Sequence, residues 1–341
     1  LVPLGRRKVI GYYIAPGSEC PEKNIKTVID VMPGGSPFNP ESFKFLRWMA
    51  DYYIANIADV LTAALPPEAR RIKKPSYIAG PGWERAVREP DIPKLLQSAL
   101  SKTGRLTSRV AANISRKFPG LIEQLLEQEA LIASYGDGAT SASDNESEEE
   151  DSIFGYIRLR PGVAELVPNE EQENAIKAIQ GGFGRFSPFL IHGVTGSGKT
   201  LVYCHIAREI LSQGKTVMVM GPEIALAGTL LSYFRSFFGS QVALIHSAMR
   251  PRDRFQVWQN IKSGRYKIVI GPRSAIFAPL DNLGLIIVDE EHDESYKQDD
   301  PAPRFQGRDA AVMRAKLADI PVILGSASPS LESYYNAQSG R

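Results

Sequence analysis

One short segment constrains the fold of this 341-residue chain more than any other, the glycine-rich run GVTGSGKT at residues 193–200. The run satisfies the pattern G-x-x-x-x-G-K-[ST], with an apolar stretch at 189–191 before it and a helical pattern at 201–211 after it. In that context the glycines let backbone N–H groups close around phosphates, where a helix N-terminus adds favourable partial charge. The sequence therefore predicts a nucleotide-binding α/β domain in which a phosphate loop joins a strand to a helix.

The residues of this loop have separate expected roles toward Mg-ATP. Lys199 is predicted to reach the β and γ phosphates, and Thr200 to ligate Mg²⁺. The remaining loop residues expected to contact the nucleotide are Gly193, Thr195, Gly196, Ser197 and Gly198.

An acidic tetrad supplies the partner that a phosphate loop requires. The apolar run at 285–288 delivers Asp289, Glu290, Glu291 and His292 to the end of a strand about ninety residues after the loop. We expect Asp289 to hold Mg²⁺ through its water shell, Glu290 to orient or deprotonate the attacking water, and His292 to sense the γ-phosphate. The alternative is that DEEH is a surface charge cluster. The position of DEEH about ninety residues after a phosphate loop disfavours that alternative.

A recurrence of short apolar runs, each followed by a loop, extends through the C-terminal half. Because strands that alternate with helices favour a parallel arrangement, this part is predicted to form one doubly wound parallel sheet. The expected strands are 217–220, 242–245, 267–270, 285–288 and 322–324.

Composition divides the chain into three expected domains and a linker. Residues 137–152 are small, polar and acidic, and cannot bury enough apolar area to offset the entropy of ordering them, so we expect a flexible linker there. A proline-rich break lies around residues 66–82. The expected domains are therefore 1–72, 76–136 and 153–341.

Charge and hydropathy restrict the partners. Residues 1–136 hold 19 Lys and Arg against 13 Asp and Glu, which fits either nucleic-acid binding or ordinary solvated surface. No apolar run approaches the roughly 18 residues of a membrane span, so no membrane association is expected. The two cysteines, Cys20 and Cys204, are too few for a disulfide framework or a four-cysteine zinc site, which is typical of an intracellular protein.

The first two domains have weaker patterns. β-prone runs at 8–14 and 27–32 precede a helical stretch at 41–65, whose aromatic stripe is more typical of a core than of a binding surface. That stripe contains Phe45, Trp48, Met49, Tyr52 and Tyr53. The second domain is predicted to hold three helices, at 92–100, 107–118 and 119–132, with Thr107 capping the middle one. Such a trio suits a helix-turn-helix or winged-helix unit, which could bind DNA or mediate packing.

Several segments resemble the DEAH/DExH boxes and neighbouring motifs of superfamily 2 helicases. The DEEH tetrad is followed by GSASP at 325–329, where that group has its S-A-T motif and Ser328 replaces the threonine. Gln172 lies ahead of the phosphate loop, GPEIAL lies at 221–226 and GPRSAIF at 271–277, all in the expected order. The resemblance implies that Gln172 contacts the nucleotide and Arg273 contacts DNA.

Longer segments resemble the PriA family of primosomal replication-restart helicases over nearly the whole chain. They include VDEEHDESYKQ, RFQGRDAAVMRA and ILGSASPSLES in the C-terminal part, and VPLGRRKVIGYYI and LRWMADYYIANIADVLTAALP at the front. The resemblance implies a multidomain fold: a β-rich, α+β N-terminal 3′-end DNA-binding domain, a winged-helix domain, and an α/β RecA-like motor lobe with a parallel sheet. It also implies that Gly5 and Lys26 contact the terminal nucleotide.

The same resemblance implies an ATP-dependent 3′ to 5′ DNA helicase that recognises stalled or branched forks and restarts replication through primosome assembly. Its expected partners are forks, single-stranded DNA, single-strand-binding protein and other primosome proteins, in the nucleoid-associated cytoplasm of a bacterium. The start of the chain is expected to be trimmed, and a second motor lobe with a zinc insertion is expected beyond residue 341. This piece is therefore expected to have little ATPase activity. The alternatives are another superfamily 2 translocase or a non-catalytic fork-binding adaptor.

Residues 295–308 (SYKQDDPAPRFQGR) are predicted to form a loop that reports DNA to the ATP site. The loop begins three residues after His292 and mixes aromatic with cationic side chains, the combination by which single-strand grooves stack bases and follow phosphates. The expected DNA contacts are Tyr296, Lys297, Arg304, Phe305 and Arg308. A plain surface loop is the alternative.

Overall fold

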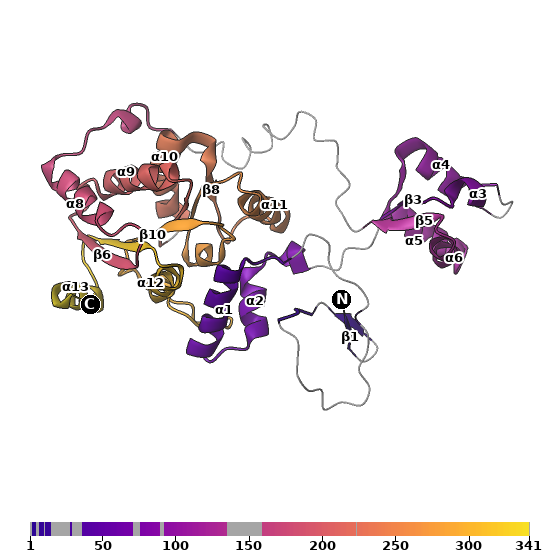
Figure 1. The fold of residues 1–341 in the computed structure, drawn as a ribbon, viewed down its shortest axis with the longest axis horizontal. Coiled ribbons are helices and arrows are strands. Elements are labelled where there is room, and N and C mark those ends of the chain that lie inside the picture. Colours follow the sequence, from indigo (N-terminus) through magenta and orange to yellow (C-terminus); the bar gives the residue numbers. More distant parts are fainter. Residues whose placement is uncertain are drawn as a thin grey trace. The chain divides into compact units, whose positions relative to one another are not determined.

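The computed structural model describes residues 2–4, 7–9, 11–14, 28, 36–70, 76–88, 92–134, 159–222 and 224–340. The chain divides into two compact units (Figure 1). The first joins residues 1–35 to 71–147, and the second joins 36–70 to 148–341. Among the described residues, no helix is long and apolar enough to cross a membrane.

A six-stranded parallel sheet forms the centre of the second unit, as the strand recurrence predicts. Its order is β6-β11-β10-β7-β9-β8, and each pairing is parallel. The strands are β6 (Ser187–His192), β7 (Thr216–Met220), β8 (Val242–Leu244), β9 (Ile268–Gly271), β10 (Leu283–Asp289) and β11 (Pro321–Ser326). Because the carboxyl ends of parallel strands share one edge, the loops after β6, β10 and β11 meet there.

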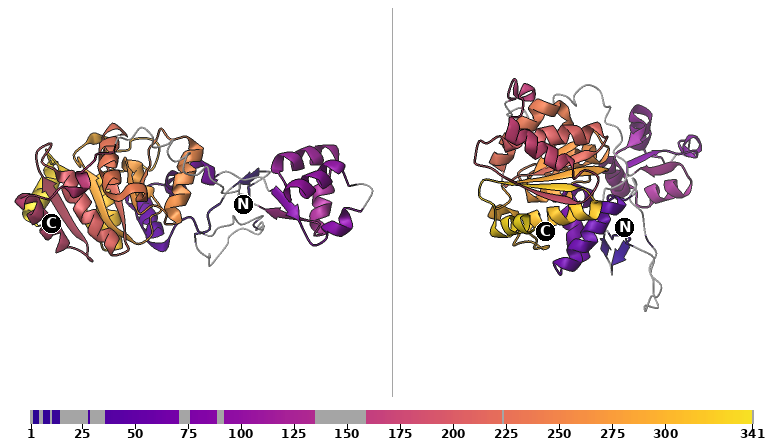
Figure 2. Two further views of the ribbon diagram at one scale, coloured as in Figure 1. Left: turned by 90° about the horizontal axis from the view of Figure 1, so that it is seen from above. Right: turned by 60° about the vertical axis from the view of Figure 1, so that its left-hand side comes forward.

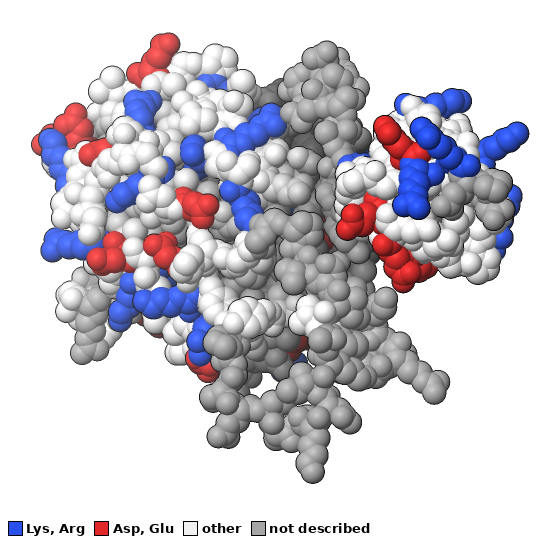
Figure 3. Space-filling view, turned by 45° about the vertical axis from the view of Figure 1, so that its right-hand side comes forward, with Lys and Arg blue, Asp and Glu red and all other residues white. Residues whose placement is uncertain are grey.

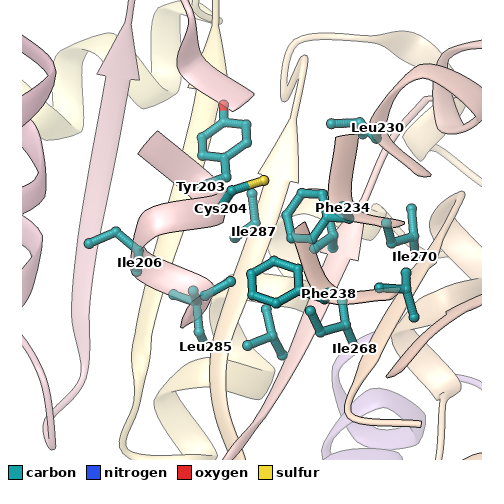
Figure 4. Close-up of a cluster of buried hydrophobic side chains, with 14 of the residues drawn as sticks. Tyr203, Cys204, Ile206, Leu230, Phe234, Phe238, Ile268, Ile270, Leu285 and Ile287 are labelled. Carbon is teal, nitrogen blue, oxygen red and sulfur yellow. The ribbon is translucent and has the colours of Figure 1, made fainter. Parts of the chain in front are cut away.

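Both faces of this sheet are covered by helices (Figure 2). On one face, alternate residues such as Val219 and Ile287 pack in a cluster with side chains of the overlying helices, part of which is drawn in Figure 4. Their neighbours Met218 and Ile286 are also fully buried, on the opposite face. Burial on both faces explains why these strands are continuous apolar runs rather than alternating ones.

The helices of the second unit follow the strands in the expected alternation. They are α8 (Glu170–Gln180), α9 (Lys199–Ser212), α10 (Ile224–Phe238), α11 (Pro251–Lys262), α12 (Gly307–Ala318) and α13 (Leu331–Ser339). Short 3-10 turns are η2 (Val163–Glu165), η3 (Gly239–Gln241), η4 (Arg273–Phe277) and η5 (Glu294–Tyr296).

The helical stretch predicted at 41–65 is two helices, α1 (Pro40–Tyr52) and α2 (Ile57–Ala64), with η1 (Pro67–Arg70) after them. The chain breaks at Ile54, which has a left-handed φ of 50° and is 94% exposed. Asn56 then caps α2 by accepting from the N–H of Ala58.

These two helices belong to the unit of the parallel sheet, so the compact units do not follow the expected boundary at residue 72. The aromatic stripe is core at Phe45 and Met49, which are buried where α1 packs on α12, whereas Trp48 and Tyr53 are half-buried and Tyr52 is 64% exposed. Arg314 of α12 is buried beneath Phe45 and Met49, donates to the carbonyls of Ile276 and Ala278, and lies 5.7 Å from the centre of the Phe45 ring. Burial lowers the pKa of Arg314 to about 10.

The first unit contains a two-stranded and a three-stranded antiparallel sheet. β1 (Val2–Leu4) pairs with β2 (Arg7–Val9), and β3 (Ser76–Ala79) lies between β4 (Arg105–Leu106) and β5 (Leu131–Ser134). Its helices are α3 (Trp83–Ala86), α4 (Lys94–Thr103), α5 (Ser108–Lys117) and α6 (Leu121–Glu127).

Three helices were expected between residues 92 and 132, and α4, α5 and α6 are found there. Thr107 caps α5 as predicted, its hydroxyl accepting from the N–H of Val110. The third helix is shorter than its pattern, because the chain turns at Glu129 (φ 55°) and enters β5. The expectations for Gly5, Lys26 and the linker at 137–152 lie outside the described residues.

A buried carboxylate joins β10 to the two last helices. Glu291 follows β10 and is 1% exposed; it accepts from the N–H and hydroxyl of Ser330 at 2.7 and 3.0 Å, and from the hydroxyl of Ser333 at 2.8 Å. Arg308 of α12 completes the set at 3.2 Å. Burial alone would raise the pKa of Glu291, but these donors outweigh it and hold the pKa below its ordinary value.

We predict that Glu291→Gln lowers the free energy of unfolding by about 2 to 3 kcal/mol, because a carboxamide leaves Arg308 without its buried anion and places N–H groups against donors. Urea unfolding at pH 7 measures the difference, with the exposed Glu332→Gln as matched control. Since the folded pKa of Glu291 is depressed, its contribution is present above the unfolded pKa of about 4.3 and is lost as pH falls through the folded value. A Glu291→Gln variant as stable as the control would contradict this role.

Candidate nucleotide-binding and coupling site

The phosphate loop lies between β6 and α9, as predicted. Gly196 and Gly198 have left-handed φ of 83° and 82°, which a side chain would strain. A Cβ on Gly198 would also lie 2.4 Å from Nε2 of Gln172. Among the described residues, the N–H groups of Gly196, Gly198 and Lys199 donate to no backbone acceptor outside the regular elements, so they are available as donors at the start of α9.

Two side chains fix this loop. The ammonium of Lys199 donates to the carbonyl of Gly193 at 2.8 Å, inside the curve of the loop. Gln172 donates to the carbonyl of Ser197 at 2.9 Å, and its own carbonyl accepts from the N–H of Asn169 in a capping box at the start of α8. The capping box places Gln172 beside the loop.

Asp289 ends β10 directly beside β11 and next to the phosphate loop. The register pairs Asp289 with Gly325 and Ser326 with His192, and the N–H of Gly193 donates to the carbonyl of Ser326 at 3.1 Å. The two segments predicted to act on Mg-ATP thus meet at the carboxyl edge of the sheet, after the two strands that flank β11.

A buried tyrosine positions the carboxylate of Asp289. The hydroxyl of Tyr203 on α9 donates to Oδ1 of Asp289 at 3.0 Å, and Tyr203 is fully buried. A Cβ on Gly325 would lie 1.7 Å from that hydroxyl, so only glycine fits there. Burial, opposed by the Tyr203 hydrogen bond and assisted by the charge of Glu290, raises the pKa of Asp289 to about 6. A divalent cation binding there would favour the ionised form.

Glu290 and His292 lie beside the segment after β11. Glu290 has a left-handed φ of 47°, uncommon for a non-glycine residue, and its Oε2 lies 3.8 Å from Nδ1 of His292. His292 hydrogen-bonds through Nδ1 to Ser326 at 2.7 Å and through Nε2 to Ser328 at 3.3 Å, the tautomer deciding which group donates. The serine that replaces the family's threonine therefore keeps a contact with the imidazole.

The loop at 295–308 corrects the predicted roles of its two aromatic residues. Tyr296 and Phe305 are 0% and 1% exposed, so they cannot stack on bases in this structure. Tyr296 donates to the carbonyl of Asp289 at 2.6 Å, and Phe305 packs edge-on against Phe277 and Tyr53. Both rings are buried and anchor the loop to the rest of the lobe. Composition alone does not distinguish such buried rings from rings that stack on bases.

The cations of this loop fall into two groups. Lys297 and Arg304 are exposed, and Lys297 lies 3.6 Å from Asp299; their contact with DNA stays a prediction. Arg308 instead binds Glu291. Arg273 donates to the carbonyls of Ser295 and Lys297 at 2.8 and 2.6 Å. These last two guanidinium groups are occupied in holding the loop, which does not match their prediction as DNA contacts.

Sequence reasoning missed several residues of the site. Tyr203 carries no motif that marks it, and Ser326, Ser330 and Ser333 lie in the ILGSASPSLES segment but were given no role. The role of Glu291 as a buried acceptor depends on α12 and α13, which the sequence pattern does not place beside it. Tyr53 was expected to be core; its hydroxyl lies 3.3 Å from the N–H and 3.4 Å from the carbonyl of Gln306. The helical spacing predicted that Tyr53 lies on the buried face of the helix, but it did not predict the contact with Gln306.

Comparison with known proteins agrees with this geometry. Residues 169–336 match the family model of DEAD/DEAH box helicases, and residues 1–66 match a model described as a 3′ DNA-binding domain. Among solved structures, the helicase domain of Hef from Pyrococcus furiosus is similar over 53% of this chain and 37% of its own, with 21% identity and a TM-score of 0.38.

Curated relatives named replication restart protein PriA match most of the chain. The protein of Chlamydia trachomatis is 34% identical over 327 residues, which cover 92% of this chain and 42% of the relative. The Bacillus subtilis protein is 30% identical over 405 residues, covering 100% of this chain and 50% of the relative. That of Treponema pallidum is 48% identical over 165 residues, 48% of this chain and 25% of the relative. The chain thus spans half or less of the length of these relatives, and by its DEAD/DEAH box lobe and its 3′ DNA-binding segment it belongs to the PriA family of replication restart proteins.

Proposed function

We propose that the protein to which this chain belongs is an ATP-driven 3′ to 5′ DNA helicase that acts at stalled or branched replication forks and restarts replication by primosome assembly. The observation that carries the proposal is that the phosphate loop and the DEEH box both lie against the end of β11, where Gly193 donates to Ser326 and Asp289 pairs with Gly325. The family match supports the DNA substrate.

The residues present fit Mg-ATP. The unengaged N–H groups of the loop and Lys199 would hold the phosphates, and the Thr200 hydroxyl with Asp289 would hold Mg²⁺. When bound, Mg-ATP would supply the γ-phosphoryl group, and its transfer to water would drive the motor. Glu290 would orient or deprotonate water, and His292, linked to Ser326 and Ser328, would transmit the state of the site to the segment after β11.

We propose that residues 295–308 couple DNA to this site through their anchors. The Tyr296 hydroxyl donates to the carbonyl of Asp289. The other end of the loop contacts Tyr53, the C-cap of α1, within the segment that matches the 3′ DNA-binding domain. Lys297 and Arg304 would meet the DNA strand. A bound DNA strand that displaces Lys297 or Arg304 would shift this loop and, through Tyr296, the backbone at Asp289.

The N-terminal part is proposed to supply DNA binding without nucleotide. Residues 1–72 would capture a 3′ end through Gly5 and Lys26, and residues 76–136 would act as a winged-helix domain. Single-strand-binding protein and other primosome proteins are proposed partners, in the nucleoid-associated cytoplasm. Another superfamily 2 translocase or a non-catalytic adaptor would be recognised by its substrate preference or its lack of ATP turnover.

The catalytic roles predict separable variants. Lys199→Ala should weaken Mg-ATP binding at least tenfold, because it removes the cation at the β and γ phosphates. Glu290→Gln should bind Mg-ATP normally and, in the complete protein, lose at least a hundredfold in hydrolysis rate. Fluorescent-nucleotide titration and steady-state ATPase assays measure these effects. Normal turnover by Glu290→Gln would show that another group activates the water.

The coupling role predicts a milder effect for Tyr296→Phe. The change keeps the buried ring and removes only the bond to the Asp289 carbonyl, so DNA-stimulated hydrolysis should fall about fivefold, as expected for one hydrogen bond of about 1 kcal/mol, while Mg-ATP affinity stays constant. Tyr335→Phe, whose ring is 62% exposed, is the matched control. Equal stimulation of both variants by single-stranded DNA would exclude Tyr296 from coupling.

A further inference from the structure

A stretch of the first unit is basic without interruption. Between residues 92 and 122 the sequence contains no Asp or Glu, whereas it contains Lys94, Lys102, Arg105, Arg109, Arg116 and Lys117. Arg105 is half-buried and the other five are exposed. No ion pair joins any of the six to an acid within the described part of the chain. Six cations without counter-charges in so short a stretch point to an anionic partner.

Most of these cations lie on α5 or directly before it in the chain. Arg109, Asn113 and Arg116 are spaced i, i+4 and i+7, so they form one stripe, opposite the buried Ala111 and Ile114. Arg105 and Lys102 lie just before the N-terminus of α5, beyond its capping residue Thr107. We call this surface, formed by Lys102, Arg105, Arg109, Asn113, Arg116 and Lys117, the α5 face. Figure 3 shows one face of the unit, with Lys and Arg side chains mainly over its upper part and right-hand edge and Asp and Glu side chains on its left and lower parts.

The next helix has the opposite charge. α6 contains Glu123 and Glu127, one helical turn apart and both exposed, and Glu129 follows it. In a helix-turn-helix or winged-helix arrangement the later helix is the one that enters the major groove of DNA. Glutamates on its open face would meet phosphates on both sides of the groove and would be repelled. The usual recognition helix is therefore unsuited to DNA in this chain.

The composition of the α5 face selects among anionic partners. Single-stranded nucleic acid is held by aromatic side chains on which bases stack, and neither α4 nor α5 contains an aromatic residue. Cations interspersed with small polar residues such as Asn113 and Ser115 are the groups that contact the sugar-phosphate backbone of a duplex. Ala112 and Asn113 are exposed, and such short side chains would let the backbones approach closely.

We propose that the α5 face binds the phosphate backbone of duplex DNA, with α6 turned away from it. This inference rests on the proposed function, which requires the protein to hold a fork, and it assigns the duplex arm of that fork to a surface other than the recognition helix. Binding there is electrostatic and independent of base sequence. It leaves the neighbouring unit free to act on the single strand.

The test compares two double variants of the full 341-residue chain that remove the same charge. Arg109→Gln/Arg116→Gln lies on the α5 face, and Arg85→Gln/Arg88→Gln removes two exposed cations around α3. Binding to a 20-base-pair blunt duplex is measured by fluorescence anisotropy between 50 and 200 mM salt, and binding to a fork, a single strand and a polyglutamate peptide is measured in the same way. Both pairs are exposed, so thermal unfolding midpoints should match that of the unmodified chain and confirm folding.

The α5-face variant should lower the slope of log affinity against log salt by about 2, because each lost phosphate contact removes about 0.9. The α3 variant should change the slope by less than half a unit. An unchanged slope for Arg109→Gln/Arg116→Gln, or an equal loss for both variants, overturns the proposal. So does a loss of binding that is confined to single-stranded DNA or to a polyglutamate peptide.

The same measurements separate this proposal from the proposed function. If the unmodified chain binds neither duplex nor fork, the proposed function fails as well. Normal fork binding with an unaffected duplex slope overturns only the role of the α5 face.

Discussion

The register among three neighbouring parallel strands is the constraint on which the candidate site depends. β11 pairs with β6 on one side and with β10 on the other, so Ser326 lies beside His192 and Gly325 beside Asp289. Because the strands are parallel, their carboxyl ends share one edge, and the phosphate loop, the DEEH box and the GSASP segment meet there. A shift of one residue in either pairing would turn Asp289 to the opposite face of the sheet and separate it from Tyr203.

Buried charged groups then fix the elements that surround this edge. Glu291 gathers donors from α12 and α13, and Arg314 joins α12 to α1 and to the carbonyls that follow β9. Leaving any of these groups without its partner inside the protein is costly, so each accepts only one arrangement of the neighbouring helices. The DEEH box therefore has a structural role beside the catalytic role proposed for it: Asp289 lies at the strand end beside the phosphate loop, whereas Glu291 is buried among donors from α12 and α13.

The contact between Tyr53 and Gln306 is one of several that join α1 and α2 to the α/β lobe. Residues 1–66 match a DNA-binding model, yet α1 and α2 pack on the lobe that contains the phosphate loop. Those helices are thus shared by a segment matched for DNA binding and by the lobe matched for helicase activity, and their corner touches the loop that ends at Asp289.

The sequence by itself determined the phosphate loop, the acidic tetrad and the parallel sheet, because each depends on local spacing: glycines where φ is positive, apolar runs that are buried on both faces, and carboxylates directly after a strand. It also determined the cap at Thr107 and the excess of Lys and Arg over Asp and Glu in residues 1–136. It did not determine the roles of Tyr296, Phe305, Arg308 and Arg273, whose composition fits a DNA-binding loop and whose partners are far away in sequence. Only the tertiary structure decided that the rings are buried, that the guanidinium groups are engaged and that α1 and α2 belong to the α/β lobe, because burial and pairing are properties of the neighbours that folding supplies and not of the residue itself.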